Sequence, residues 1–353
     1  MKRLRAFKYY SPLLLYVTAY VAFTQRGVLT FLPLAYSFLF IPVLELFLRP
    51  DPANLSETEE AIVKKDPAYD LILYMVAGLQ LVALFWFFQA LQEPALTRTE
   101  IAGRIISMGL LCGVFGINVG HELGHRIHKA DQRLAKLLLL TSLYMHFFIE
   151  HNKGHHKHVA TPQDPSSARW GESVYFFWPR TILNSYRSAW RIANEEVRKK
   201  GHAVWSIHNE MLQLQLIQLL FLSVIYIYFG TFLLCCFLGA AALGILMLET
   251  VNYIEHYGLS RKQLENGKYE RALPEHSWNS DHVIGRLMLF ELSRHSDHHY
   301  LASRKYPLLR HHNQAPQMPT GYPGMMILSL LPPLWFNVMH RRMSAFYSTT
   351  TAA

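Results

Sequence analysis

The chain has 353 residues, of which 51% are hydrophobic and only 17% are charged, and its formal net charge is +9. So few charged residues among so many apolar ones indicate a membrane protein rather than a soluble domain. The three cysteines form no CxxC pair, which excludes a disulfide framework, a zinc ribbon and a fused iron–sulfur module. No recognisable nucleic-acid-binding module accompanies the positive charge, so we expect no nucleic-acid partner.

The apolar residues are gathered into six segments that we predict to be transmembrane helices. The run from Met211 to Leu248 contains no charged side chain and can hold two spans of about 20 residues, with Gly230 at its only turn signal. Because the first and fourth segments are short for a bilayer, a soluble protein with buried core helices is the alternative. The predicted spans are residues 9–24, 28–48, 71–91, 102–120, 211–229 and 231–252.

The basic residues predict the orientation, because Lys and Arg are retained on the cytoplasmic side of a membrane. With six spans, all 34 Lys and Arg residues except Arg26, Arg98 and Arg104 fall on one side. That side is predicted to be cytoplasmic, with both termini on it, and no cleavable signal is evident. The final apolar stretch from Tyr322 is interrupted by two prolines, and we expect it to lie at the membrane interface or to re-enter.

The predicted spans divide the chain into four segments. Residues 1–120 hold helices one to four, and residues 211–252 hold helices five and six. Residues 121–210 and 253–353 are expected on the cytoplasmic side, where they form a helical cap. The predicted fold is therefore an all-α integral membrane six-helix bundle with a cytoplasmic helical cap.

Nine histidines occur in spaced groups at the cytoplasmic ends of the predicted spans. The motifs "HELGH" and "HNKGHH" each place two histidines four residues apart, on one face of a helix. The motif "RHSDHH" supplies a third group, and "NYIEHYG" adds one histidine just past the sixth span. Groups far apart in sequence can therefore meet in one polar site at the membrane surface. The nine are His121, His125, His151, His155, His156, His256, His295, His298 and His299.

Nine imidazoles exceed the roughly four ligands that one tetrahedral zinc ion accepts, so the sequence predicts two metal ions. Imidazole suits iron, zinc, copper and nickel, and ligand type alone does not select the metal. A zinc pair would suit hydrolysis, whereas an iron pair would suit oxygen chemistry. An apolar bundle that ends at the metals favours the second, with a lipid-like substrate delivered from the bilayer.

Acidic residues beside the histidine motifs are candidate acceptors for the outer N–H groups of the imidazoles. These candidates are Glu122, Glu150, Asp164, Glu255, Asp281 and Asp297. Three further histidines, His158, His276 and His282, lie near the motifs but outside their spacing. We expect these three to support the site or the fold rather than to bind metal.

The motifs "NVGHELGHR", "EHNKGHHKHVATPQDPSSAR", "NYIEHYGL", "HSWNSDH" and "LSRHSDHHY" together resemble the bacterial membrane alkane 1-monooxygenases. These enzymes form a branch of the histidine-box membrane desaturase and hydroxylase superfamily. The similarity runs from about Gly109 to the "PPLWFNVM" near the C-terminus, and upstream it is mainly a similarity of span layout.

The resemblance implies a non-haem di-iron centre that activates O2 and hydroxylates a terminal methyl group to a primary alcohol. It implies that all nine histidines named above are the iron ligands, with no assignment of individual histidines to either iron. It also implies a location in the bacterial inner membrane.

The chain contains no flavin, nicotinamide or iron–sulfur motif, although insertion of one oxygen atom from O2 consumes two electrons. The resemblance implies that rubredoxin and rubredoxin reductase supply them. Basic clusters at Arg198 to Lys200, at Arg304 and at His340 to Arg342 make an acidic donor plausible. The alternative is that these clusters face anionic lipid headgroups.

The sequence is also compatible with two other functions. A related di-iron membrane enzyme, either an aromatic-methyl hydroxylase or a lipid desaturase, would use the same centre. A protein for metal transport or storage would also need many histidines, but transport predicts polar ligands at mid-membrane. The predicted spans are nearly devoid of ionisable groups, which favours the enzyme.

Overall fold

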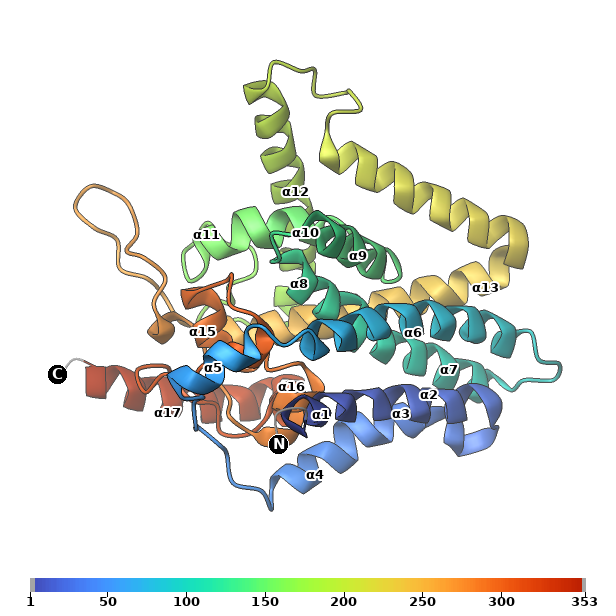
Figure 1. The fold of residues 1–353 in the computed structure, drawn as a ribbon, viewed down its shortest axis with the longest axis horizontal. Coiled ribbons are helices and arrows are strands. Elements are labelled where there is room, and N and C mark those ends of the chain that lie inside the picture. Colours follow the sequence, from blue (N-terminus) through green and yellow to red (C-terminus); the bar gives the residue numbers. More distant parts are fainter. Residues whose placement is uncertain (1–3, 351–353) are drawn as a thin grey trace.

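The computed structural model describes residues 4–350, which fold into helices joined by loops (Figure 1). Within that range the extended pairing is limited to two isolated bridges, Gln263 with Tyr269 and Asn279 with Gln317. The all-α prediction is therefore confirmed. The α-helices are α1 (Leu4–Phe7), α2 (Leu14–Thr24), α3 (Leu32–Ala35), α4 (Ile41–Glu45), α5 (Glu57–Val63), α6 (Ala68–Leu91), α7 (Arg98–Leu111), α8 (Asn118–Gly124), α9 (Lys129–Leu140), α10 (Phe147–Glu150), α11 (His156–His158), α12 (Val174–Lys199), α13 (Glu210–His256), α14 (Val283–Met288), α15 (His295–Tyr300), α16 (Tyr322–Ser329) and α17 (Pro332–Thr350).

Seven further helical segments complete the fold. Four are 3₁₀ helices: η1 (Lys8–Leu13), η2 (Gly27–Phe31), η6 (Pro274–His276) and η7 (Tyr306–Leu308). Three are π-helices: η3 (Tyr36–Phe40), η4 (Cys112–Ile117) and η5 (His151–His155).

Four continuous helical segments are long and apolar enough to cross a membrane. They are Gly27–Glu45, Ala68–Leu91, Arg98–Gly124 and Glu210–His256. The first three coincide with the predicted spans at 28–48, 71–91 and 102–120, so the chain is a multi-pass membrane protein by length and composition of its helices.

The number of membrane passages stays a prediction. The long helix α13 contains both of the predicted spans at 211–229 and 231–252. It is interrupted at Gly230, whose φ of 75° and ψ of 178° are not helical, and Figure 1 shows that the chain reverses its course within α13. The predicted span at 9–24 corresponds to η1 followed by α2, of which α2 has only 11 residues.

Close helix crossings hold the membrane segments together at small residues. Gly244 of α13 faces η4, where a Cβ atom on the glycine would lie 2.7 Å from the Cβ atom of Cys112. A side chain at this position would push the two helices apart, as expected where small residues let transmembrane backbones approach each other. At one end of the spans, the buried Arg104 of α7 donates to the carboxylate of Glu93 at 2.8 Å and to the carbonyl of Ala90 at 2.6 Å, which ties α7 to the C-terminal end of α6.

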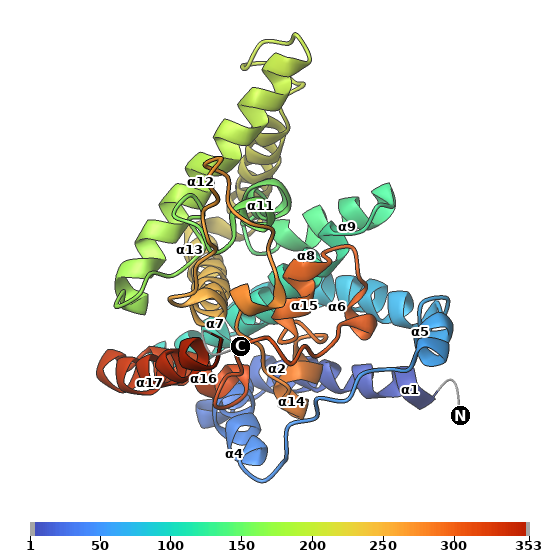
Figure 2. The same cartoon turned by 90° about the vertical axis from the view of Figure 1, so that its left-hand side faces the viewer.

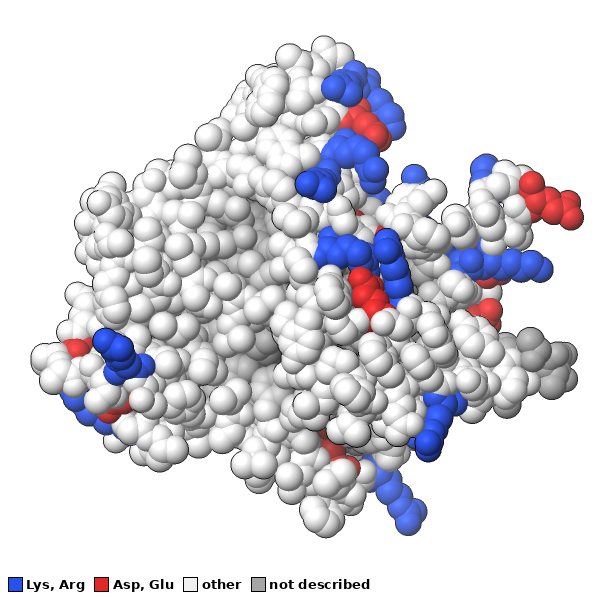
Figure 3. Space-filling model, turned by 180° about the vertical axis from the view of Figure 1, so that it is seen from behind, with Lys and Arg blue, Asp and Glu red and all other residues white. Residues whose placement is uncertain are grey.

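At the other end of the spans, the helices that carry the histidine motifs come together, and α12 passes crosswise to α6 and α7 (Figures 1 and 2). Figure 3 shows that Lys and Arg gather at this end, with a few more at the opposite end and a broad surface free of charge between them. The apolar stretch from Tyr322 forms two helices, α16 and α17, and neither meets the length and hydropathy expected of a membrane span.

Candidate metal centre

Nine imidazoles converge where the ends of α8 and α13 meet α11, α15 and η5. They form two clusters, and within each cluster one ring nitrogen of every histidine lies within 4.8 Å of the others. The first cluster has five members: His121, His125, His151, His156 and His298. The second has four: His155, His256, His295 and His299. The structure therefore brings together all nine histidines singled out from the sequence and divides them into two sets.

The five-histidine cluster is a closed ring of Nε2 atoms. Going round it, the successive Nε2 to Nε2 distances from His121 to His298, His156, His151, His125 and back are 3.0, 3.0, 3.0, 3.1 and 3.1 Å.

The four-histidine cluster is a chain of Nε2 atoms. His155 lies 3.2 Å from His299, His299 lies 2.9 Å from His295, and His295 lies 3.1 Å from His256. In both clusters the same ring nitrogen, Nε2, points inward.

The π-helix η5 decides how the second motif is shared between the clusters. An α-helix would align His151 with His155, four residues on, but the wider π turn aligns His151 with His156, five residues on. His155 is thereby turned toward the other cluster. In α15 the ordinary i, i+4 relation holds between His295 and His299. His298, which lies between them in sequence, joins the five-histidine cluster.

Burial keeps these imidazoles neutral, which is the form that binds metal. It lowers the pKa of His125 from 6.5 to about 3, with further contributions from His155 and Arg126. Burial, followed by neighbouring histidines, also lowers the pKa values of five others well below 6.5: those of His151, His156, His295, His298 and His299.

The donor set fits two metal ions. A neutral imidazole has one N–H group and one lone pair, so a ring of five inward-facing nitrogens cannot satisfy itself by hydrogen bonds alone. Nitrogens about 3 Å apart are spaced as ligands around an ion at the usual metal–nitrogen distance of roughly 2.0–2.1 Å. The geometry therefore supports a metal centre with two positions, and imidazole ligands do not distinguish iron from zinc, copper or nickel.

Two of the six candidate carboxylates contact the clusters. Asp164 accepts from Nδ1 of His155 at 2.9 Å, and the hydroxyl of Ser167 donates to the same oxygen at 2.6 Å. Glu255 places Oε2 at 3.2 Å from Nε2 of His295, on the inner side of that ring. The phenol of Tyr322 donates to its other oxygen at 2.7 Å.

The other four carboxylates form no hydrogen bond with the clustered imidazoles, and a buried oxygen of Glu150 has no hydrogen-bond partner among the described residues. Glu122 accepts from Arg126 at 2.6 Å and from the backbone N–H of Tyr306 at 3.1 Å. Asp297 accepts from Arg304 and His312. No hydrogen bond from a clustered imidazole to Glu122, Glu150, Asp281 or Asp297 is found within residues 4–350.

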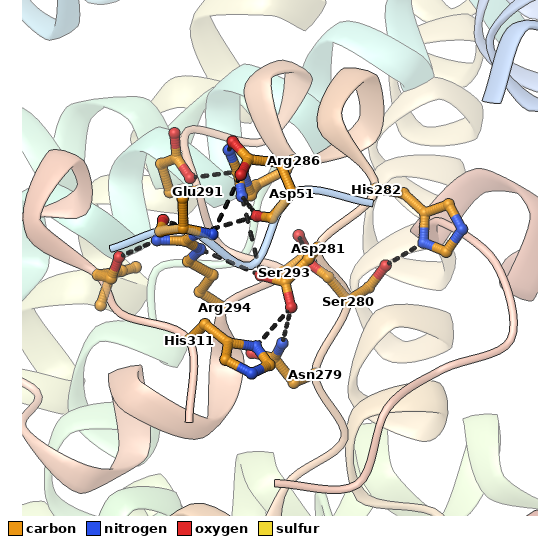
Figure 4. A network of polar contacts seen from close by, with 12 residues as sticks. Asp51, Asn279, Ser280, Asp281, His282, Arg286, Glu291, Ser293, Arg294 and His311 are labelled. Atoms are coloured by element: carbon orange, nitrogen blue, oxygen red, sulfur yellow. Dashed lines mark hydrogen bonds and ion pairs between the residues drawn. The ribbon is translucent and has the colours of Figure 1, made fainter. Parts of the chain in front are cut away.

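Asp281 belongs to a polar network that adjoins the start of the third histidine motif, "RHSDHH" (Figure 4). It accepts from the guanidinium of Arg294 at 3.3 Å and from Nδ1 of His311 at 2.7 Å. Arg294 directly precedes His295 and also donates to the backbone carbonyls of Asp51 and Ala53. The network therefore fixes the start of α15 and, with it, the direction of the third histidine motif.

The three extra histidines lie outside both clusters. His282 shares a hydrogen bond with Ser280 at 3.1 Å (Figure 4). His276 accepts from the backbone N–H of Leu273 at 3.0 Å, and His158 belongs to neither group of converging nitrogens.

Tyr322 links the four-histidine cluster to an apolar cavity. The cavity has a volume of about 60 Å³, and a second one of about 370 Å³ lies beside it. Phe38, Met247 and Met326 line both. The role of Tyr322 was not predictable from the sequence, because this residue lies far along the chain from Glu255 and belongs to no histidine motif.

Comparison with known proteins identifies the family of this chain. Residues 101–329 match the sequence model of the fatty acid desaturase family. An alkane 1-monooxygenase of Pseudomonas aeruginosa is 41% identical over 87% of this chain and 82% of its own length. An alkane 1-monooxygenase of Acinetobacter baylyi is 39% identical over 87% of this chain and 75% of its own length.

A more distant relative is the hydroxylase component of a xylene/toluene monooxygenase of Pseudomonas putida. It is 31% identical over 70% of this chain and 65% of its own length. The resemblance drawn from the histidine motifs is confirmed, and the chain belongs to the alkane 1-monooxygenases, membrane monooxygenases of the fatty acid desaturase family.

Proposed function

We propose that this protein hydroxylates the terminal methyl group of alkane-like molecules to a primary alcohol, with O2 as co-substrate. The observation that carries the proposal is the contact between Tyr322, which lines the apolar cavity, and Glu255, which reaches His295. A molecule without polar groups can thus lie in an apolar site that is linked to the histidines through Tyr322 and Glu255.

We propose further that the two clusters hold two iron ions, with the nine histidines as ligands. A terminal C–H bond is strong and offers no polar handle, so acid–base chemistry cannot activate it, and a bound iron pair would supply the oxidising power. As nine neutral ligands, the histidines would leave the positive charge of such a pair uncompensated.

The protein's own residues then have three tasks. The apolar side chains around Phe38, Met247 and Met326 exclude water and hold the hydrocarbon chain. Asp164 accepts the outer N–H of His155, which fixes the tautomer and orientation of that ring. Tyr322 holds Glu255 in place at the boundary between the cavity and the four-histidine cluster.

Electrons must come from a partner, and we propose rubredoxin with rubredoxin reductase. The cationic end of the molecule in Figure 3 suits an acidic donor. Of the three basic clusters expected to attract it, Arg304 is paired with Asp297, and His340 is hydrogen-bonded to Tyr257 and stacked on Trp170. Arg198, Lys199 and Lys200 are exposed, and so are Arg341 and Arg342 of the third cluster, so these two clusters present their charge to a partner.

We retain the predicted topology as part of this proposal. Six spans in the bacterial inner membrane would place both termini, the cap of residues 121–210 and 253–353, and the metal centre in the cytoplasm. The clustering of Lys and Arg at the histidine end of the molecule supports that orientation.

Aromatic-methyl hydroxylation is the second candidate, because the xylene/toluene monooxygenase component is a relative. The higher identity to alkane 1-monooxygenases, over more of the chain, favours alkanes. The decisive experiment supplies the purified protein with octane, O2, NADH, rubredoxin and its reductase, and quantifies metals in parallel. About two irons per chain together with 1-octanol would support the proposal; stoichiometric iron with a product only from toluene, or only an alkene from a saturated lipid, would replace it.

A further inference from the structure

Helix α12 presents three different sides along its length. One side is buried against the rest of the protein. The second is an exposed apolar strip, with Phe176 77%, Leu183 56%, Tyr175 49% and Tyr186 37% exposed. The third is cationic. At about 100° per residue the cationic side lies directly beside the apolar strip. It carries Arg180, Arg187, Arg191 and Arg198.

The cationic side of α12 borders a groove. Two hollows of about 390 and 530 Å³ meet along it and share Gln163, Ser188 and Arg191 as lining residues. The basic residues of the lining are Lys153, Lys157, Arg169, Arg180, Arg187, Arg191 and Lys199, and the acidic ones are Asp164, Glu195 and Glu196. The groove therefore carries a positive net charge.

Several of these charges are already neutralised within the protein. Arg180 pairs with Glu172 at 2.6 Å, and Lys153 pairs with Glu196 at 2.7 Å. Asp164 is turned toward His155. Arg187 and Arg191, in contrast, form no ion pair with an acidic residue within residues 4–350. Two guanidinium groups one helical turn apart are thus left for an external anion.

The place of α12 in the fold identifies the partner. The helix runs crosswise to the membrane-spanning helices at their histidine end (Figures 1 and 2), where the charge-free surface of Figure 3 gives way to the cationic end. A helix at this depth meets acyl chains on one side and headgroup phosphates on the next.

We propose that α12 is an interfacial helix that binds an anionic phospholipid. The phosphate lies in the groove against Arg187 and Arg191, and the acyl chains lie along the strip that contains Phe176 and Leu183. An acidic protein would account for the arginines but not for the strip of large apolar side chains directly beside them, whereas a lipid accounts for both. Because Asp164 lines the same groove and holds His155, the lipid would also support the segment that carries the second histidine motif.

The test compares the full protein in nanodiscs of phosphatidylcholine with and without phosphatidylglycerol. Bound lipid is counted by native mass spectrometry, and the unfolding temperature is measured in the same discs. The variant Arg187→Gln/Arg191→Gln removes the two free guanidinium groups. The control Lys262→Gln/Lys268→Gln removes the same charge from exposed positions of the loop after α13.

We expect phosphatidylglycerol to raise the unfolding temperature of the wild-type protein and of the control. In the arginine variant that rise should disappear and phosphatidylglycerol binding should weaken roughly tenfold or more, because each basic residue near an anionic surface contributes to lipid binding. The variant Phe176→Ser/Leu183→Ser should weaken binding of the lipid but not of soluble glycerol phosphate, which separates a lipid from a free phosphate as the ligand.

Three outcomes would overturn the proposal. The first is an equal response of the arginine variant and the lysine control, which would indicate general surface electrostatics. The second is soluble glycerol phosphate stabilising the protein as well as the lipid does. The third is unchanged lipid binding by the arginine variant together with a raised KM for rubredoxin, which would assign the groove to the electron donor.

Discussion

Oε2 of Glu255 lies 3.2 Å from Nε2 of His295, on the side of the imidazole that faces the other members of the four-histidine cluster. Its second oxygen is held by the phenol of Tyr322, which lines the apolar cavity. The Tyr322 phenol is therefore the polar group that connects the cavity to the histidines through a single carboxylate.

Replacing Tyr322 by Phe should separate the role of this contact from the role of the histidines. The change leaves an acceptor oxygen of a buried carboxylate without its donor, which costs about 1–3 kcal/mol of stability. We expect two metal ions per chain to remain bound, while alcohol formed per NADH consumed falls because Glu255 is no longer fixed. Metal analysis and product yield on the same preparation test this, and loss of metal together with activity would contradict it.

The division into two clusters predicts that alanine substitutions of two neighbouring histidines have different effects on metal content. His299→Ala leaves three imidazoles in the smaller cluster, whereas His298→Ala leaves four in the larger one, the usual number for a tetrahedral ion. We expect the His299 variant to retain close to one metal per chain and the His298 variant close to two, measured after identical loading with zinc. His282→Ala, outside both clusters, is the control, and equal losses from the two variants would refute the division.

Asp164→Asn should weaken metal binding without removing a ligand. Loss of a carboxylate that accepts from a ligating histidine typically lowers metal affinity by about 10–100-fold. Competition with a chelator measures the change. Ser167→Ala is the matched control, because it removes one hydrogen bond to Asp164 and keeps the carboxylate. An Asp164 variant that binds metal no more weakly than this control would show that His155 is oriented by other contacts.

The histidine motifs were predictable from the sequence because their spacing is local, and the amount of helix was predictable because the apolar runs are long. The division into clusters was not, since it depends on the π turn at His151–His155, for which the spacing alone carries no signal. Adjacency in sequence also does not determine which acids contact an imidazole. Glu122 follows His121 in α8 and therefore points about 100° away from it, toward Arg126.

Asp164 shows the converse case. It reaches His155 because the turn after α11 folds the chain back, so that a loop residue nine positions away meets the outer nitrogen of the ring. Such a contact depends on loop geometry, which neither periodicity nor composition specifies.

The two apolar cavities predict which substitutions change the preferred chain length of the alkane substrate. Phe38, Met247 and Met326 line both cavities, so they form the partition between the space of about 60 Å³ that Tyr322 lines and the neighbouring one of about 370 Å³. Phe38→Ala should open this partition and raise the relative rate on longer alkanes, while Met247→Phe should narrow it and favour shorter ones. Competition between alkanes of different length, read as alcohol ratios, tests the pair, and a parallel fall for all lengths would point to a packing defect.

The stability of the metal-free protein should fall steeply in mild acid. Burial lowers the pKa of His125 to about 3 and lowers the pKa values of His151, His156, His295 and others well below 6.5. Between pH 6.5 and about 3 the unfolded chain therefore binds more protons than the folded one, so the free energy of unfolding rises with pH and is lost as the pH falls through this window. Each such histidine contributes up to about 1.4 kcal/mol per pH unit. The free energy of unfolding of the chelator-treated protein, measured at pH 7.5, 6.5 and 5.5, gives the slope against pH. The variant His125→Gln should reduce this slope. A free energy of unfolding that does not change between these pH values would mean that the clustered imidazoles stay accessible to protons in the folded protein.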